Sequence, residues 1–324
     1  MSKRLLSVSL VALVLTGAWP LGAEQAAAPP TAISAPAAAP EYGPAKGTLV
    51  IVGGAMSDTF GIPQRFIELA GGPGKKFVIV PTNGGNRGAD GAPVVYKEET
   101  VLAAWKKRGL TNVVMLHTWD PKVADTEAFV TPLLDADAVW FDGGRQWNMV
   151  DSYMNTRTLK AFWDVLNRGG VIAGSSAGAT IQGDYLVRGD TKGPDIMMTE
   201  EPNHQRGFAF LKRSAIDQHI NTRNRWDDLV PVITKYPQYL GIGLSEDTAI
   251  VVTGDRFEVI GRWKVTAHDN TQAYEPWEKP YDVLNVGDVY DMKARKIIKR
   301  GNGATPGRGR GAGRAAQGVL PAPQ

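Results

Sequence analysis

Short apolar runs alternate with longer amphipathic segments through the middle of the chain. The apolar runs are rich in β-branched residues and span residues 48–52, 77–80, 113–116, 138–141 and 171–173. The amphipathic segments between them predict helices over residues 63–70, 98–107, 126–134 and 158–167. Continuous apolar strands that are separated by helices are typical of a parallel sheet covered on both faces. The pattern therefore predicts a three-layer α/β fold with a mostly parallel sheet.

After His219 the pattern changes, because strands follow one another without long helices between them. Residues 248–252 and 257–260 are the clearest of these runs. Strands joined by short connections pair antiparallel. We therefore expect antiparallel edge strands toward the C-terminus of the domain.

The two ends of the chain differ in composition from the body. Residues 1–23 combine a basic start, an apolar run and small residues, which predicts a cleaved signal peptide; an uncleaved N-terminal anchor is the alternative. Residues 24–46 are rich in Ala and Pro and predict an extended linker, and residues 301–324 predict a disordered Gly/Arg-rich tail. The catalytic α/β domain is thus expected over residues 47–300, in an exported protein that is periplasmic or extracellular.

Composition narrows the classes of function. The 36 basic and 33 acidic residues give a formal charge of +3, and the three arginines after Arg300 account for this excess. The body of the chain therefore has no excess of positive charge with which to bind nucleic acid. The chain has no cysteine, which excludes a lipid-anchored lipoprotein site, a disulfide framework and a thiolate nucleophile. The four histidines show no metal-ligand spacing. No metal, cofactor, nucleic acid or stable membrane anchor is expected.

Three loops at predicted strand ends carry unusual chemistry. They are Gly53-Gly54-Ala55, residues 142–146 and residues 174–179. The last fits G-x-S-x-G between a strand and a predicted helix start, the context of a nucleophile turn at Ser176. The Ala177 amide, with Gly144 from the second loop, would then stabilise an oxyanion. A Gly/Ser-rich phosphate loop or an ordinary turn is the alternative.

A serine nucleophile of the usual kind needs a histidine base and an acid that orients it. The candidates for the base are the four histidines, of which His219 lies in an apolar-flanked segment. Glu246 lies between two apolar runs and fits the third member, and Asp247 is its competitor. The order Ser, His, Glu differs from the Ser, acid, His order of α/β-hydrolases.

Four motifs in order give the chain a specific resemblance. They are residues 141–146, 174–179, 217–219 and 241–249. Together they resemble the serine peptidase family that contains cyanophycinase and aspartyl dipeptidase (peptidase E). The resemblance implies a sheet like that of class I glutamine amidotransferases. It also implies that Ser176 is the nucleophile, His219 the general base and Glu246 its orienting acid.

The same resemblance implies a set of substrate-binding residues, namely Gln146, Asp217, Gln218, Arg223 and Arg225. If residues 218–225 run extended, Arg223 and Arg225 fall on the face of His219 and would bind carboxylates bidentately. Asp217 would pair with an arginine side chain of the substrate. The alternative is a solvated charged loop, or pairing of the two arginines with Asp227 and Asp228.

The sequence thus predicts an exported cyanophycinase-like serine exopeptidase. It would hydrolyse the polyaspartate backbone of cyanophycin to β-Asp-Arg dipeptides through an acyl-enzyme, as the resemblance implies. Two alternatives stay open: a peptidase of the same family for another acidic or isoaspartyl peptide, and a non-catalytic binding protein on the same fold. The expected partner is a peptide or polymer substrate, and a homodimer stays open.

Overall fold

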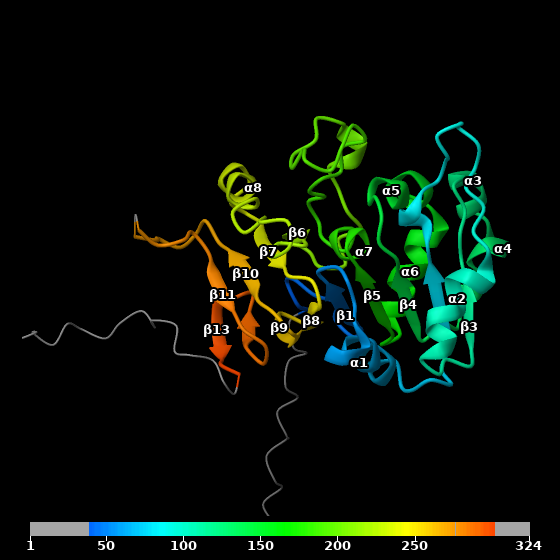
Figure 1. The fold of residues 1–324 in the computed structure, drawn as a ribbon, viewed down its shortest axis with the longest axis horizontal. Helices are drawn as coiled ribbons and strands as arrows, with labels where there is room; N and C mark the ends of the chain where they lie inside the picture. Colours follow the sequence, from blue (N-terminus) through cyan, green and yellow to red (C-terminus); the bar gives the residue numbers. More distant parts are fainter. Residues whose placement is uncertain (1–38, 276, 302–324) are drawn as a thin grey trace, which may run out of the picture. The chain divides into compact units, whose positions relative to one another are not determined.

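The computed structural model describes residues 39–275 and 277–301. The body of the chain folds around a nine-stranded mixed sheet (Figure 1). Five parallel strands lie in the order β1-β5-β4-β2-β3: β1 (Thr48–Val52), β5 (Val171–Ser175), β4 (Ala138–Phe141), β2 (Phe77–Val80) and β3 (Val113–Met115). Antiparallel strands extend the sheet beyond β1: β8 (Thr248–Thr253), β9 (Arg256–Gly261), β12 (Val289–Asp291) and β13 (Lys296–Lys299). The expected α/β fold with antiparallel edge strands is confirmed.

Helices cover both faces of this sheet because successive strand residues point to opposite sides. In β1, Val50 and Val52 pack with residues of α1 (Ile62–Leu69) and α2 (Glu98–Lys107). Leu49 and Ile51 belong instead to a core that includes residues of α5 (Trp147–Tyr153) and α6 (Arg157–Asn167). The predicted helix over residues 126–134 is shorter than expected. It divides into α4 (Glu127–Val130) and a 3₁₀ turn over Thr131–Leu133, because Pro132 cannot donate the backbone hydrogen bond that would continue α4.

A second sheet of four strands was not foreseen from the sequence. Its order is β11-β10-β7-β6, with β6 (Ser214–Gln218) parallel to β7 (Leu240–Leu244). Antiparallel strands β10 (Val265–His268) and β11 (Asp282–Leu284) complete it. The short helix α7 (Ala177–Thr180), which follows β5, contacts both β5 and β6. It therefore links the ends of strands from the two sheets. The remaining helices are α3 (Pro121–Ala124) and α8 (Val230–Lys235).

The described part begins inside the segment predicted as a linker. Tyr42 is buried, its N–H donates to the Asp255 carboxylate, and its carbonyl accepts from the Lys212 N–H. Residues 39–46 thus pack against the domain. The predicted signal peptide, the rest of the linker and nearly all of the predicted tail lie outside the described residues. Within the described ranges, no helix is long and apolar enough to span a membrane.

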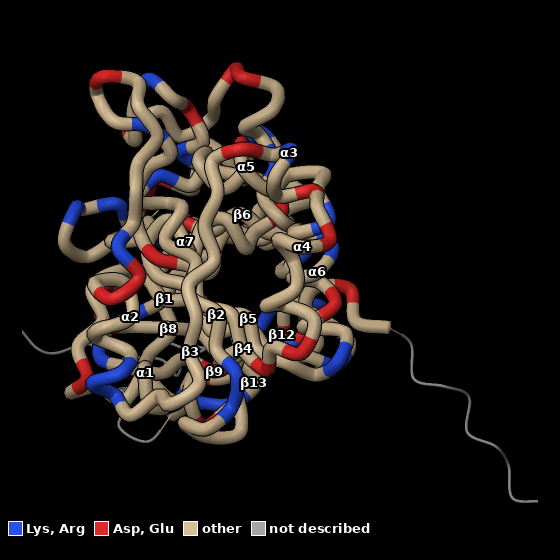
Figure 2. The backbone as a smooth tube through the Cα atoms, turned by 90° about the vertical axis from the view of Figure 1, so that its right-hand side faces the viewer, with Lys and Arg blue, Asp and Glu red and all other residues tan. Residues whose placement is uncertain are grey.

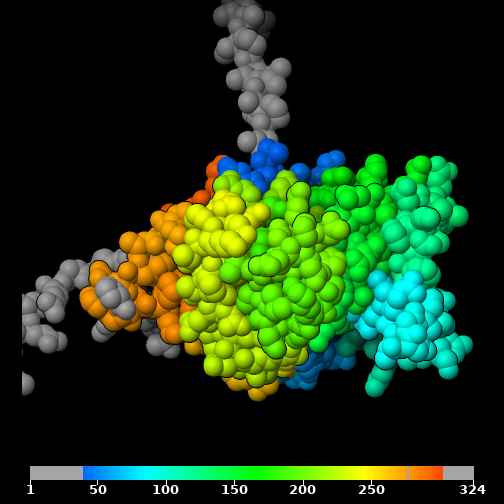
Figure 3. Space-filling view, turned by 90° about the horizontal axis from the view of Figure 1, so that it is seen from above, coloured from blue at the N-terminus to red at the C-terminus, as the bar shows by residue number. Residues whose placement is uncertain are grey.

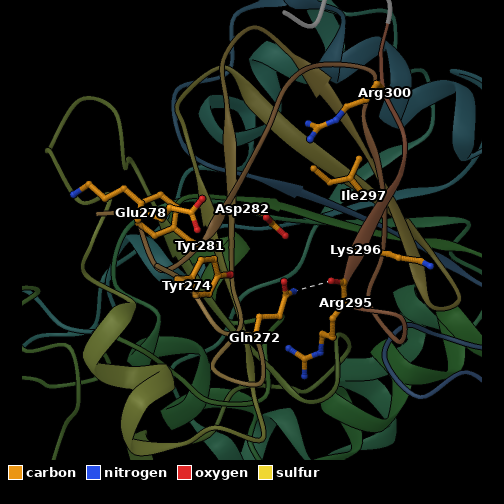
Figure 4. A pocket seen from close by; sticks show the side chains of 10 residues that line it. Gln272, Tyr274, Glu278, Tyr281, Asp282, Arg295, Lys296, Ile297 and Arg300 are labelled. Atoms are coloured by element: carbon orange, nitrogen blue, oxygen red, sulfur yellow. Dashed lines mark hydrogen bonds between the residues drawn. The ribbon is translucent and has the colours of Figure 1, made fainter. Parts of the chain in front are cut away.

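Charges of both signs are interspersed along the described backbone, which agrees with the balanced composition of the body (Figure 2). A polar cleft of about 560 Å³ lies beside β13, and its lining includes Tyr274, Asp282, Arg295 and Arg300. Gln272 donates to the Arg295 carbonyl across this cleft (Figure 4). All residues that line the cleft fall between 272 and 300, outside the loops predicted to carry the chemistry.

Candidate active site

Ser176 occupies a sharp turn between β5 and α7. Its φ of 58° and ψ of −118° are values that a non-glycine residue rarely adopts, and strain of this kind concentrates at functional sites. The two glycines of the motif allow the turn to close, because a Cβ on Gly174 would lie 2.4 Å from the Gly178 carbonyl oxygen. The chain therefore presents the Ser176 side chain at the end of the central strand β5.

His219 meets this serine from the second sheet. It directly follows β6, and its Nε2 lies 2.8 Å from Ser176 Oγ. Its backbone N–H donates to the Gly53 carbonyl at 2.7 Å, which ties the histidine to the end of β1. A Cβ on Gly54 would lie only 2.2 Å from His219 Cε1, so this glycine leaves room for the imidazole. The Gly-Gly pair after the first strand is thus part of the site.

Glu246 completes the chain of hydrogen bonds. Its Oε1 lies 2.6 Å from His219 Nδ1. The two residues meet because β6 and β7 are parallel neighbours, so the segments that follow both strands leave the sheet at the same edge. The Glu246 N–H donates to Asn221 Oδ1, which fixes the glutamate backbone. No motif or spacing in the sequence predicts this role of Asn221.

Asp247, the alternative acid, faces the loop after β1 instead. Its Oδ1 accepts from the Ser57 N–H at 2.7 Å, and its own N–H donates to the carbonyls of Gly54 and Ala55. Asp247 therefore holds the loop that packs against the His219 ring, while Glu246 contacts the ring itself.

The surroundings of His219 favour its neutral form. Burial lowers its pKa, the Glu246 hydrogen bond raises it, and the charges of Arg223 and Arg225 lower it, so that the pKa lies below its usual value. With Nδ1 bonded to the glutamate, neutral Nε2 is free to accept the Ser176 proton. This is the state that a general base requires.

The expected oxyanion donors, Ala177 and Gly144, lie in α7 and in the loop after β4. The Ala177 N–H is in the first turn of α7, where a helix offers no internal acceptor. The loop after β4 approaches from the other side, since a Cβ on Gly143 would lie 3.3 Å from Ser176 Cβ. Gly144 has a φ of +139° and packs against the Asn83 carbonyl, where only glycine fits. In the same loop, burial raises the pKa of Asp142 to about 6, opposed by a hydrogen bond from Trp140.

The structure shows which groups the side chains of Gln146 and Asp217 bind within the chain. The Gln146 side chain is buried and donates to the carbonyls of Val187 and Arg188 at 2.7 and 2.8 Å. Asp217 is fully buried and binds the Arg188 guanidinium through both oxygens. Both side chains thus have hydrogen-bond partners within the chain, and their role in substrate binding stays a prediction. Because Arg188 and Asp217 lie 29 positions apart, no local motif in the sequence predicts that they pair.

Residues 218–225 do not run extended, so that expectation is wrong. β6 ends at Gln218, His219 has a φ of 59°, and a turn follows in which the Arg225 N–H donates to the Ile220 carbonyl. Arg223 is exposed, whereas the Arg225 side chain is 8% exposed and lies 3.9 Å from Asp217. Both guanidinium charges still act on His219. Gln218 is buried next to the base, and its Oε1 has no hydrogen-bond partner among the described residues.

Asp227 and Asp228, the alternative partners of the two arginines, bind other cations. Asp227 pairs with Lys279 at 2.8 Å, and Asp228 pairs with Arg188. The three other histidines also bond elsewhere: His117 to Thr82, His268 to Thr266, and His204 to Glu201 and Asp151. In the described ranges, no group of three or more His, Asp or Glu side chains is arranged to hold a metal ion.

The site contains a serine on a strand–turn–helix that is hydrogen-bonded to a histidine, which is in turn hydrogen-bonded to a glutamate. On an α/β sheet, this arrangement defines the serine hydrolase class. The family model "Peptidase family S51" matches residues 49–260. The chain belongs to this family of serine-type peptidases.

Relatives agree with this assignment. The chain is 27% identical over 233 residues to a cyanophycinase of Geminocystis herdmanii, covering 69% of this chain and 81% of the relative. A cyanophycinase of Nostoc sp. is 26% identical over 276 residues, covering 78% and 88%. Among solved structures, a peptidase from an acI-B1 actinobacterium is 23% identical, with a TM-score of 0.55 over 76% of this chain and 97% of that one. The last likeness shows the shared fold.

Proposed function

We propose that this peptidase cleaves an aspartate-rich backbone such as that of cyanophycin through an acyl-enzyme on Ser176. The observation that carries the proposal is the series of contacts Ser176–His219–Glu246, at 2.8 and 2.6 Å, with two arginine charges beside it. The cyanophycinases among the relatives support the choice of polymer.

The reaction follows from the positions of the side chains. His219 Nε2 takes the proton of Ser176 as Oγ attacks the peptide carbonyl, and Glu246 stabilises the imidazolium through Nδ1. The Ala177 N–H and the loop at Gly143 and Gly144 stabilise the oxyanion. His219 then gives its proton to the leaving amine as the C–N bond breaks. Water, deprotonated by the same imidazole, hydrolyses the ester and restores Ser176.

The direct test is to incubate the protein with purified cyanophycin and identify the products by mass spectrometry. We expect β-Asp-Arg dipeptides to be released from the polymer. The control is the same protein carrying Ser176→Ala. Intact polymer after prolonged incubation, with hydrolysis of another acidic or isoaspartyl peptide, would reassign the substrate and keep the peptidase.

Exposed Arg223 is expected to bind a substrate carboxylate. Arg223→Ala should raise KM about 10- to 100-fold with a smaller change in kcat, since a charge-assisted hydrogen bond is lost. Arg223→Lys should recover only part, because a point charge does not reproduce the planar guanidinium. Steady-state kinetics measures both parameters, and Arg213→Ala, which removes an exposed arginine paired with Glu41, is the matched control. Equal KM values for Arg223→Ala and wild type would withdraw the carboxylate-binding role.

The same arginine should affect the pH profile. His219 must be neutral to act, so kcat/KM should rise with pH through the lowered pKa of His219 and level off above it. Removing the positive charge of Arg223 stabilises the imidazolium and raises this pKa, so Arg223→Ala should move the acid limb to higher pH. Burial raises the pKa of Asp142 to about 6, and we expect its contribution to the profile to be the same in both proteins. An unmoved or downward-shifted limb would show that another group controls the profile.

We also propose that the chain is exported. The support is the basic start at Lys3 and Arg4, the apolar run over residues 5–15 and the small residues that end at Ala23. N-terminal sequencing of protein recovered from periplasmic and extracellular fractions should find a chain that begins near residue 24. A chain that begins at Met1 in the cytoplasmic fraction alone would contradict export.

A further inference from the structure

Arg188 is a buried cation in the segment that follows α7. Its side chain is 3% exposed, and its backbone has a φ of 56° that non-glycine residues seldom adopt. Its N–H donates to the Met197 carbonyl, and its own carbonyl accepts from Gln146. The backbone is therefore held from both sides in an unfavourable conformation, which indicates that the position of the guanidinium is specified.

The guanidinium is surrounded by acceptors on three sides. Nε and Nη2 donate to the two oxygens of Asp217 at 2.8 and 3.0 Å. Nη2 also donates to Asp228, and Nη1 donates to the Pro194 carbonyl at 2.7 Å. Two carboxylates and a carbonyl around a planar cation form a complete binding site for one guanidinium.

This guanidinium site adjoins the catalytic base. Asp217 lies two residues before His219 on β6, and Asp228 lies in the segment between β6 and α8. Seen from above, the green surface of the segment after α7 lies beside the yellow surface around α8 (Figure 3). Asp217 is fully buried, and both of its oxygens accept hydrogen bonds from Arg188.

We propose that Arg188 is an internal ligand that fills this guanidinium site, so that the enzyme does not read an arginine side chain of its substrate through Asp217. The active site selects the backbone carboxylates of the substrate through Arg223. It accepts substrate side groups with or without a guanidinium. This statement about specificity rests on the proposed peptidase function, whereas the occupancy of the site by Arg188 is independent of it.

The first experiment measures occupancy without any substrate. Arg188→Ala should lower Tm by roughly 5–15 °C, because two carboxylates lose their buried counter-ion. Methylguanidinium at about twenty times its Kd should restore about 3–5 °C of this loss. Wild type should gain nothing, since its site is full. Ethylammonium is the control for charge without planar donors, and Arg188→Ala/Asp217→Asn is the control that removes the acceptor.

Two results would contradict the proposal that Arg188 fills the guanidinium site. One is that methylguanidinium stabilises wild type as much as Arg188→Ala. The other is that it stabilises Arg188→Ala no more than the double variant. Should Arg188→Ala fail to fold, the second experiment decides, because Arg188→Met/Asp217→Asn removes both members of the buried pair and keeps similar volume.

The second experiment compares two aspartyl polymers whose side groups are arginine and its uncharged isostere citrulline. The ratio of their kcat/KM values should be the same, within about threefold, in wild type and in Arg188→Met/Asp217→Asn. A preference for arginine in wild type that collapses in the double variant would overturn the proposal. If wild type cleaves neither polymer, the proposed function fails, and the Tm experiment alone decides the role of Arg188.

Discussion

Replacing Ser176 by alanine is expected to lower kcat at least about 10³-fold while the fold persists, because the covalent route is lost. The hydroxyl is the atom that His219 Nε2 contacts at 2.8 Å, and no second hydroxyl takes part in that contact. The backbone conformation of residue 176 is strained, with a φ of 58°, and alanine adopts it at a cost similar to that for serine. Kinetics on an acidic peptide, with circular dichroism to confirm folding, measures the effect.

Ser175 is the matched control for this prediction. It precedes the nucleophile, ends β5 and pairs with Val52 of β1 in the sheet. Ser175→Ala removes a hydroxyl from the same turn and leaves the contact between Ser176 and His219 in place, so its effect should be mild. A Ser176→Ala variant that keeps more than about a tenth of the activity would refute the assignment of the nucleophile. A fluorophosphonate probe should label Ser176 in wild type and fail to label that variant.

The sequence predicted the central sheet because each strand there is a continuous apolar run. It also predicted the turn at Ser176, because a serine flanked by glycines between a strand and a helix start is typical of a nucleophile turn. The second sheet escaped prediction, since β6 and β7 are separated by about twenty residues with only the short helix α8 between them. Its parallel pairing is nevertheless what places Glu246 beside His219.

Two features around the predicted substrate-binding residues depend on tertiary structure that local spacing does not encode. The alternation of strand residues stops at Gln218, where the chain turns and His219 adopts a left-handed conformation. The Asp217 carboxylate likewise has a partner within the chain, because it accepts a hydrogen bond from Arg188. Pairs of residues that meet only through tertiary contacts leave no periodicity in the sequence, so neither feature could be found from spacing.

Glu246→Gln is expected to lower kcat about 10²- to 10⁴-fold with little change in KM. The Glu246 carboxylate accepts from His219 Nδ1 at 2.6 Å. In the proposed reaction it stabilises the imidazolium that forms when Ser176 attacks. A neutral amide cannot supply that charge, and when its NH₂ group faces Nδ1 it favours the tautomer that carries the proton on Nε2. That tautomer cannot accept the serine proton. Substrate binding should be nearly unaffected, because the glutamate acts on the far side of the ring.

Asp247→Asn separates this effect from a general loss of charge beside the base. Asn keeps an oxygen to accept from the Ser57 N–H, and the backbone bonds of residue 247 to Gly54 and Ala55 are unchanged. Its effect on kcat should therefore be far smaller than that of Glu246→Gln. Rates measured over a range of pH give a further distinction. Loss of the Glu246 charge lowers the pKa of His219, so the acid limb of Glu246→Gln should move to lower pH even as the plateau falls. An Asp247→Asn variant as impaired as Glu246→Gln would mean that the loop after β1, rather than the tautomer of the imidazole, limits the reaction.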